Sequence, residues 1–153
     1  MKLLNTAKVL VLIPVAAMLI SCVGIFAKAE RGTLPDLLSS EWALSYISSM
    51  QLNTDYRPTL ALSEDLTASG FAGCNRYRSG VELAATDELM FTAIVTTKRA
   101  CLNTPMKSED AYLAALRSVS SWSITRNVLR LMDKDGNTLL KFKRFGANPG
   151  PNI

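Results

Sequence analysis

Apolar and polar residues alternate in short runs between residues 41 and 145, and turn-forming residues separate the runs. An alternation with a period of two is typical of strands that are buried on one face. The pattern therefore predicts eight strands. They span residues 42–47, 59–62, 66–71, 77–83, 88–96, 122–125, 128–132 and 138–142.

In one segment, residues 108–119, the apolar residues recur at the spacing of a helix and not of a strand. Ser108 is expected to cap this helix, with Glu109 and Asp110 in its first turn, where acidic residues are favoured. The apolar side of the predicted helix consists of Tyr112, Leu113, Leu116 and Val119. We expect this side to pack on the sheet.

The last three strands form two hairpins, which turn at Arg126-Asn127 and at residues 133–137, where an Asp-Gly pair favours a tight turn. The second turn is not interpreted as a calcium loop, because an EF-hand needs further ligands, a closing glutamate and flanking helices. Many short antiparallel strands and one helix predict a mainly β, α+β fold. We expect a small, partly open, barrel-like antiparallel sheet with the helix over one opening.

The N-terminus has the pattern of an export signal. Lys2 and Lys8 precede an uncharged stretch, Val9–Ile20, which is shorter than the roughly 20 residues of a membrane-spanning helix. The stretch ends in Leu19-Ile20-Ser21-Cys22, which resembles the lipobox of bacterial lipoproteins. The resemblance implies that Cys22 is diacylated, and the residue after it, Val23, implies the outer membrane, facing the periplasm. The alternative is an ordinary signal peptide in which Cys22 has no special role.

Removal of residues 1–21 would leave 132 of the 153 residues, enough for one domain. We expect a lipidated tether over residues 22–40, a folded domain over 41–145 and a flexible tail over 146–153, which is rich in Gly, Pro and Asn.

With Cys22 lipidated, Cys74 and Cys101 remain as an even pair in an oxidising compartment. We expect them to form a disulfide. The alternative is two buried thiols that act as small apolar residues.

Charge and composition narrow the function classes. Without Lys2 and Lys8 the chain has 15 basic and 13 acidic residues, and no basic run is interleaved with aromatic residues, so no nucleic-acid partner is predicted. The chain has no histidine, which removes the commonest general base and a common metal ligand. We therefore predict no enzymatic activity, no cofactor and no metal site.

Polar residues beside the two cysteines form a candidate binding patch. The patch consists of Asn75, Arg76, Thr97, Lys98 and Arg99. A disulfide would bring its two halves together, and the cationic side chains could receive an acidic peptide or an anionic head group. The alternative is a solvated rim around a cross-link.

Four motifs carry a resemblance to a known family. They are G-F-A-G-C-N-R-Y at 70–77, T-T-K-R-A-C at 96–101, E-D-A-Y-L-A-A-L at 109–116 and L-R-L-M-D-K-D-G-N-T-L-L-K-F at 129–142. In this order they resemble the META domain, or HslJ-like, family over about residues 41–142. The chain departs from the family at Arg99, where Met is frequent, and at Leu62, where an aromatic residue is common.

The resemblance implies a small antiparallel barrel-like sheet with one helix, and no established catalytic activity. It implies a non-enzymatic envelope lipoprotein, active in the stress response or in surface maintenance through binding of a peptide, protein or lipid. A fold-level similarity to pilotins gives the alternative, an assembly factor for an outer-membrane secretin. The expected partners are the membrane, through the lipid anchor, and an unknown envelope component.

Overall fold

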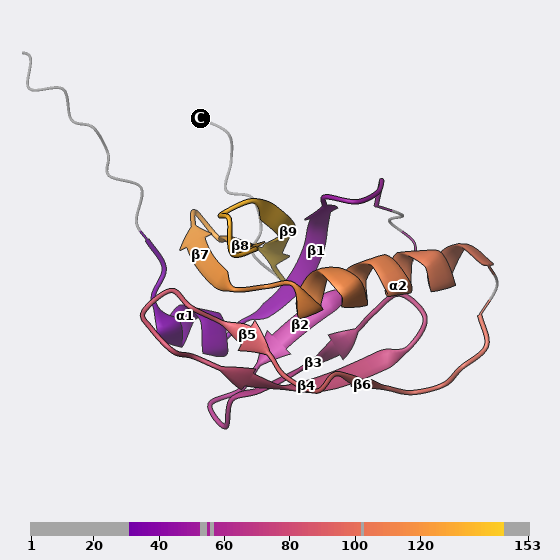
Figure 1. The fold of residues 1–153 in the computed structure, drawn as a ribbon, viewed down its shortest axis with the longest axis horizontal. Helices are drawn as coiled ribbons and strands as arrows, with labels where there is room; N and C mark the ends of the chain where they lie inside the picture. The colour runs from indigo at the N-terminus through magenta and orange to yellow at the C-terminus, as the bar shows by residue number, and fades with distance from the viewer. Residues whose placement is uncertain (1–30, 53–54, 56, 102, 146–153) are drawn as a thin grey trace, which may run out of the picture.

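The computed structural model describes residues 31–52, 55, 57–101 and 103–145. Nine strands form one antiparallel, nearly closed barrel-like sheet, which confirms the predicted fold class (Figure 1). The elements are α1 (Leu34–Leu38), β1 (Glu41–Ile47), β2 (Thr59–Leu62), β3 (Thr67–Phe71), β4 (Arg76–Glu82), β5 (Met90–Phe91), β6 (Val95–Thr96), α2 (Asn103–Arg117), β7 (Ser121–Thr125), β8 (Val128–Met132) and β9 (Thr138–Arg144). The strand order is β5-β4-β3-β2-β1-β9-β8-β7, and β6 also pairs with β4.

The edge of β7 is covered by two other segments. The amide of Trp122 donates to the carbonyl of Asp87 at 2.8 Å, and the amide of Gly32 donates to the carbonyl of Ile124 at 2.9 Å. The first contact brings β7 to the segment just before β5, at the other end of the strand order. An exposed edge is a template for unwanted pairing, so these contacts both protect β7 and bring the sheet close to closure.

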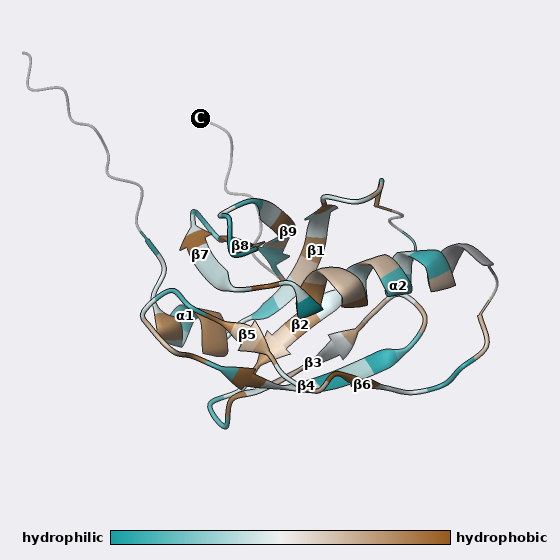
Figure 2. Ribbon diagram, viewed as in Figure 1, coloured by the Kyte–Doolittle hydropathy of each residue, from teal (hydrophilic) through white to brown (hydrophobic). Residues whose placement is uncertain are grey.

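The inward positions of the strands and the apolar side of α2 share one core. Tyr112, Leu113 and Leu116 of α2 are buried, as is Val119 just after it, which confirms the predicted packing side of the helix. The strand residues with no exposed surface include Trp42, Leu44, Leu60, Leu129, Leu131, Leu140 and Phe142. Buried and exposed residues alternate along β4, and Figure 2 shows hydrophilic residues on β4 and hydrophobic residues on α1 and β5.

Both predicted hairpins are confirmed. Arg126 and Asn127 have φ values of 49° and 61°, as a type I′ turn requires. In the second turn the Asp133 carboxylate accepts the amides of Asp135 and Asn137 at 3.0 and 2.8 Å. The acidic residue thus organises its own turn, as interpreted from the sequence.

The single strand predicted over residues 88–96 is wrong, because it is broken into β5 and β6. Val81 pairs with Phe91 and Arg78 pairs with Val95, so three residues on one strand lie opposite two on the other. The extra residue is a bulge, and it interrupts the ladder along the edge of β4.

Two points about the helices also need correction. The long helix begins at Asn103, so Ser108 is a buried residue inside α2 and not its cap. Proline is tolerated in a first helical turn, where its missing amide hydrogen has no helical partner, so Pro105 does not stop the helix. The second correction is α1, which was not predicted. Its Leu37 is fully buried in the core, so packed structure begins before residue 41, inside the predicted tether.

Candidate functional site

The loop between β3 and β4 is covalently joined to the segment before α2. Cys74 and Cys101 form the predicted disulfide, with Cα atoms 6.1 Å apart. Gly73 before the bridge has a φ of 123°, a conformation that favours glycine, so the chain can turn into the bridge at this point. The free-thiol alternative is therefore wrong in this structure, and neither sulfur is available as a nucleophile.

A buried carboxylate on α2 fixes the same loop. The Glu109 side chain is 9% exposed and accepts the backbone amide of Cys74 at 3.1 Å. It also accepts the backbone amide of Asn75 and, at 2.9 Å, the side-chain amide of Asn75. Three donors satisfy this charge, which makes its burial tolerable.

Glu109 was missed as a functional position because acidic residues near a helix start usually face solvent. A signal was present in the spacing: Glu109 lies three residues before Tyr112 and four before Leu113, on the apolar side of the helix. An acidic residue at such a position must find internal donors, and the backbone of the 74–75 loop supplies them.

Asn75 connects this loop to the segment after β6. Its side-chain oxygen accepts the Thr97 hydroxyl at 2.9 Å and the backbone amide of Arg99 at 2.7 Å. The Thr97 hydroxyl in turn accepts the amide of Arg76 at 3.2 Å. Asn75 is only 6% exposed, so it is a structural link and not part of the predicted surface patch.

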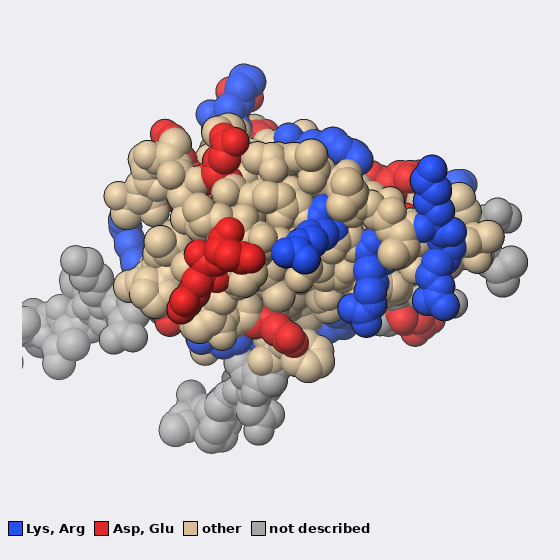
Figure 3. Space-filling view, turned by 90° about the horizontal axis from the view of Figure 1, so that it is seen from below, with Lys and Arg blue, Asp and Glu red and all other residues tan. Residues whose placement is uncertain are grey.

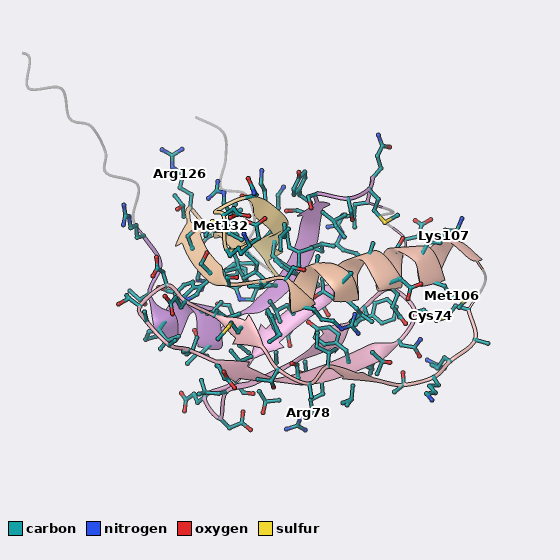
Figure 4. The ribbon with its side chains drawn as sticks, viewed as in Figure 1. Cys74, Arg78, Met106, Lys107, Arg126 and Met132 are labelled. Atoms are coloured by element: carbon teal, nitrogen blue, oxygen red, sulfur yellow. A yellow bond between two sulfur atoms is a disulfide. The ribbon has the colours of Figure 1, made fainter. Side chains whose placement is uncertain are left out.

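The cationic members of the predicted patch do come together on the outside. Arg76, Lys98 and Arg99 are exposed, and so is Arg78, which lies two residues along β4 on the same outward face. We call these four residues the cationic surface. Figure 3 shows several blue side chains on the face seen from below, and Arg78 points away from the body in Figure 4. Within the described part of the chain no carboxylate forms an ion pair with any of the four.

A tyrosine pair lies behind this surface. The Tyr77 and Tyr112 hydroxyls are 2.9 Å apart, and both reach the carbonyl of Thr59, at 3.0 and 3.2 Å. Burial raises the pKa of both phenols above the usual value of tyrosine. The pair ties α2 and β4 to β2, so the cationic side chains stand on a rigid support.

The predicted N-terminal features lie outside the residues that the structure describes. Cys22 and the predicted export signal fall in residues 1–30, which the structure does not describe. No helix in the described ranges is long and apolar enough to cross a membrane. A group of three or more potential metal ligands is also absent from the described ranges.

Solved structures show similar folds. An NMR structure of a protein from Burkholderia xenovorans is 30% identical, covers 71% of this chain and 83% of its own, and gives a TM-score of 0.57. A crystal structure of a DUF4847 family protein from Bacteroides vulgatus is 14% identical, with coverages of 70% and 93% and a TM-score of 0.52. The second likeness shows the fold alone. A search of curated protein sequences finds no match.

A family model gives the identity that the motifs suggested. The META domain model matches residues 35–145, which include the disulfide, the Glu109–Asn75 contacts and all nine strands. The match begins one residue into α1, in agreement with the burial of Leu37. The chain therefore belongs to the META domain family.

Proposed function

We propose that this protein is a non-enzymatic lipoprotein of the bacterial envelope, which serves in the stress response or in surface maintenance by binding an anionic partner. One observation carries the proposal: four cations without ion-pair partners in the described structure stand on a backbone fixed by a disulfide and a buried carboxylate. Rigid presentation lowers the entropic cost of binding, and a cation without an ion-pair partner does not have to break a salt bridge to bind an anion.

The polar groups behind the surface support binding over chemistry. Asn75, Glu109 and the two tyrosines all have internal hydrogen-bond partners. They hold the surface in place through these internal contacts.

The membrane attachment is tested first. In the full-length protein, palmitate labelling should disappear when Cys22→Ser is introduced, and the variant should leave the membrane fraction. Labelling that persists in the Cys22→Ser variant would remove the lipoprotein part of the proposal.

The binding function is tested by charge reversal. Full-length protein is cross-linked in cells and purified from solubilised membranes with Arg78, Lys98 and Arg99 changed to Glu. A matched control changes Arg117, Arg126 and Lys134 to Glu, which alters the net charge equally elsewhere; Arg126 lies on the opposite side from Arg78 (Figure 4). We expect recovery of a cross-linked envelope component to fall at least about tenfold in the first variant only. Equal recovery from both variants would contradict the proposal.

The same purification tests the pilotin-like alternative. A secretin subunit recovered in stoichiometric amount would support an assembly factor. Recovery of phospholipid alone, with no protein, would instead identify the partner of the cationic surface as a head group.

A further inference from the structure

The ladder between β2 and β3 contains a local defect. Their pairing includes Ala61 with Ser69, but the ladder does not continue to the next hydrogen-bonding pair toward the start of β2, Thr59 with Phe71. There the amide of Phe71 donates to the side-chain oxygen of Thr59 at 3.1 Å, while the Thr59 carbonyl accepts the two tyrosine hydroxyls. The Thr59 hydroxyl therefore accepts the hydrogen bond that a backbone carbonyl accepts in a regular ladder, and the Thr59 carbonyl bonds to the tyrosines.

Gly70 lies at this defect for a steric reason. A Cβ atom at Gly70 would lie 2.1 Å from the Thr59 carbonyl oxygen. Every other residue type would push the two strands apart. The defect is therefore built into the sequence and is not an irregularity of one side-chain conformation.

A cleft of about 330 Å³ lies at the defect. Its floor includes Ala61 and Ser69, two small residues that pair on the outward face of the sheet. Its lining also includes Glu41 of β1, Arg76 of β4 and Phe145. This volume falls at the lower end of the range that small ligands occupy.

Opposite charges stand on opposite sides of the cleft. Glu41 and Arg76 are separated by β2 and β3, so about three strand spacings, roughly 15 Å, lie between their backbones. The Phe145 side chain is 66% exposed, its amide donates to the carbonyl of Glu41, and both residues line the cleft.

We propose that this cleft binds a short peptide of three or four residues with both ends free. The peptide carboxylate lies against Arg76, its amino group lies near Glu41, and an apolar side chain packs on Phe145. Extended chain covers about 3.3–3.6 Å per residue, so three or four residues span about 10–14 Å, which matches the separation once the two long side chains lean inward. The inference rests on the proposed function, because Arg76 belongs to the cationic surface and the peptide would be the class of partner received there.

The test is calorimetric titration of the full-length protein in detergent with Ala-Phe-Ala. The same peptide is also titrated with its carboxyl end amidated and, separately, with its amino end acetylated. We expect amidation or acetylation each to weaken binding about tenfold, the loss typical of one charge-assisted contact. Arg76→Gln should remove the preference for the free carboxylate, and Glu41→Gln the preference for the free amine.

The site is located with a blocking variant and its matched control. Ser69→Trp should fill the cleft and abolish binding. Thr67→Trp, on the same strand and outward face but outside the lining, should bind as the wild type does.

Two outcomes would overturn the inference. One is the absence of binding up to about 10 mM peptide, a concentration that detects even millimolar affinity. The other is equal affinity for the free, amidated and acetylated peptides. Failure here with a positive cross-linking result would reject only the peptide cleft, because the cross-linking variants leave Arg76 unchanged. Peptide binding without the cross-linking effect would instead reject the proposed envelope partner of the other three cations.

Discussion

The two helices are attached to the same sheet by different chemistry. The long helix α2 is held by the buried Glu109 carboxylate and by a disulfide just before its first turn. The short helix α1 is held by an ion pair between Arg144 and Asp36 at 3.4 Å, by the Trp42 indole donating to the Leu37 carbonyl at 3.3 Å, and by buried Leu37. The charged group that holds α2 is buried, with Glu109 9% exposed, whereas the Asp36 side chain that holds α1 is 41% exposed.

The difference in burial between the two attachments determines how much their polar contacts contribute to stability. A buried charge that loses its donors is left desolvated, which is costly, while an exposed charge returns to water. We therefore expect the α2 attachment to depend on its polar groups and the α1 attachment to depend on Leu37. The proposed binding function follows the same division, because the rigid α2 side carries the cationic surface.

The largest effect should come from the disulfide. Changing both Cys74 and Cys101 to Ala opens a loop with a sequence separation of 27. The loss of loop-closure entropy in the unfolded chain predicts that the free energy of unfolding falls by roughly 3–4 kcal/mol. Urea unfolding of the wild type with and without reductant measures the loss. The double variant is its own control, because reductant should not change it. A loss below about 1 kcal/mol would mean that Glu109 alone fixes the loop.

Glu109→Gln should have the next largest effect. The glutamine amide group would face donors where the carboxylate accepts three hydrogen bonds, so we expect a loss of about 2–3 kcal/mol. Denaturant unfolding measures it, with Asp110→Asn as the matched control on the exposed side of α2. Equal effects of the two variants would contradict the importance of burial in this comparison.

The tyrosine pair predicts a loss of stability at alkaline pH. Both phenols have raised pKa values in the folded state, so their stabilisation is fully present below pH 10 and is lost as the pH rises above it, when the unfolded chain ionises first. Each tyrosine should lower the unfolding free energy by about 1.4 kcal/mol per pH unit in that window. Tyr112→Phe should remove one of the two contributions, and unfolding curves between pH 9 and 11 measure the slope. A pH slope that Tyr112→Phe leaves unchanged would contradict the assignment of the alkaline loss of stability to the tyrosine pair.

The sequence predicted the parts of the molecule that follow a regular pattern. Both hairpins and the apolar side of α2 follow from alternation and helical spacing, and the disulfide from the even pair of cysteines. These features depend on the residues themselves or on near neighbours in the chain.

The features that it missed depend on contacts between distant segments. The bulge between β5 and β6 arises from register along β4, and Glu109 is placed inward by a loop 34 residues away. Five-residue α1 is too short for helical periodicity and forms because Leu37 finds the core. The cleft exists because Thr59 turns its carbonyl to tyrosines from two other elements, which no local pattern shows.

The smallest effect is expected at α1. Asp36→Asn removes the ion pair to Arg144, and the exposed carboxylate contributes less than any group above. Hydrogen bonds from Thr33 lower the pKa of Asp36 in the folded state. The contribution of Asp36 to the free energy of unfolding is therefore present above about pH 4 and is lost as the pH falls through the folded pKa. The variant and the wild type should therefore differ slightly at pH 7 and converge at pH 2–3, and the difference at pH 7 should shrink in 1 M salt. A loss as large as that of Glu109→Gln would show that polar contacts hold both helices alike, and the contrast between the two attachments would be wrong.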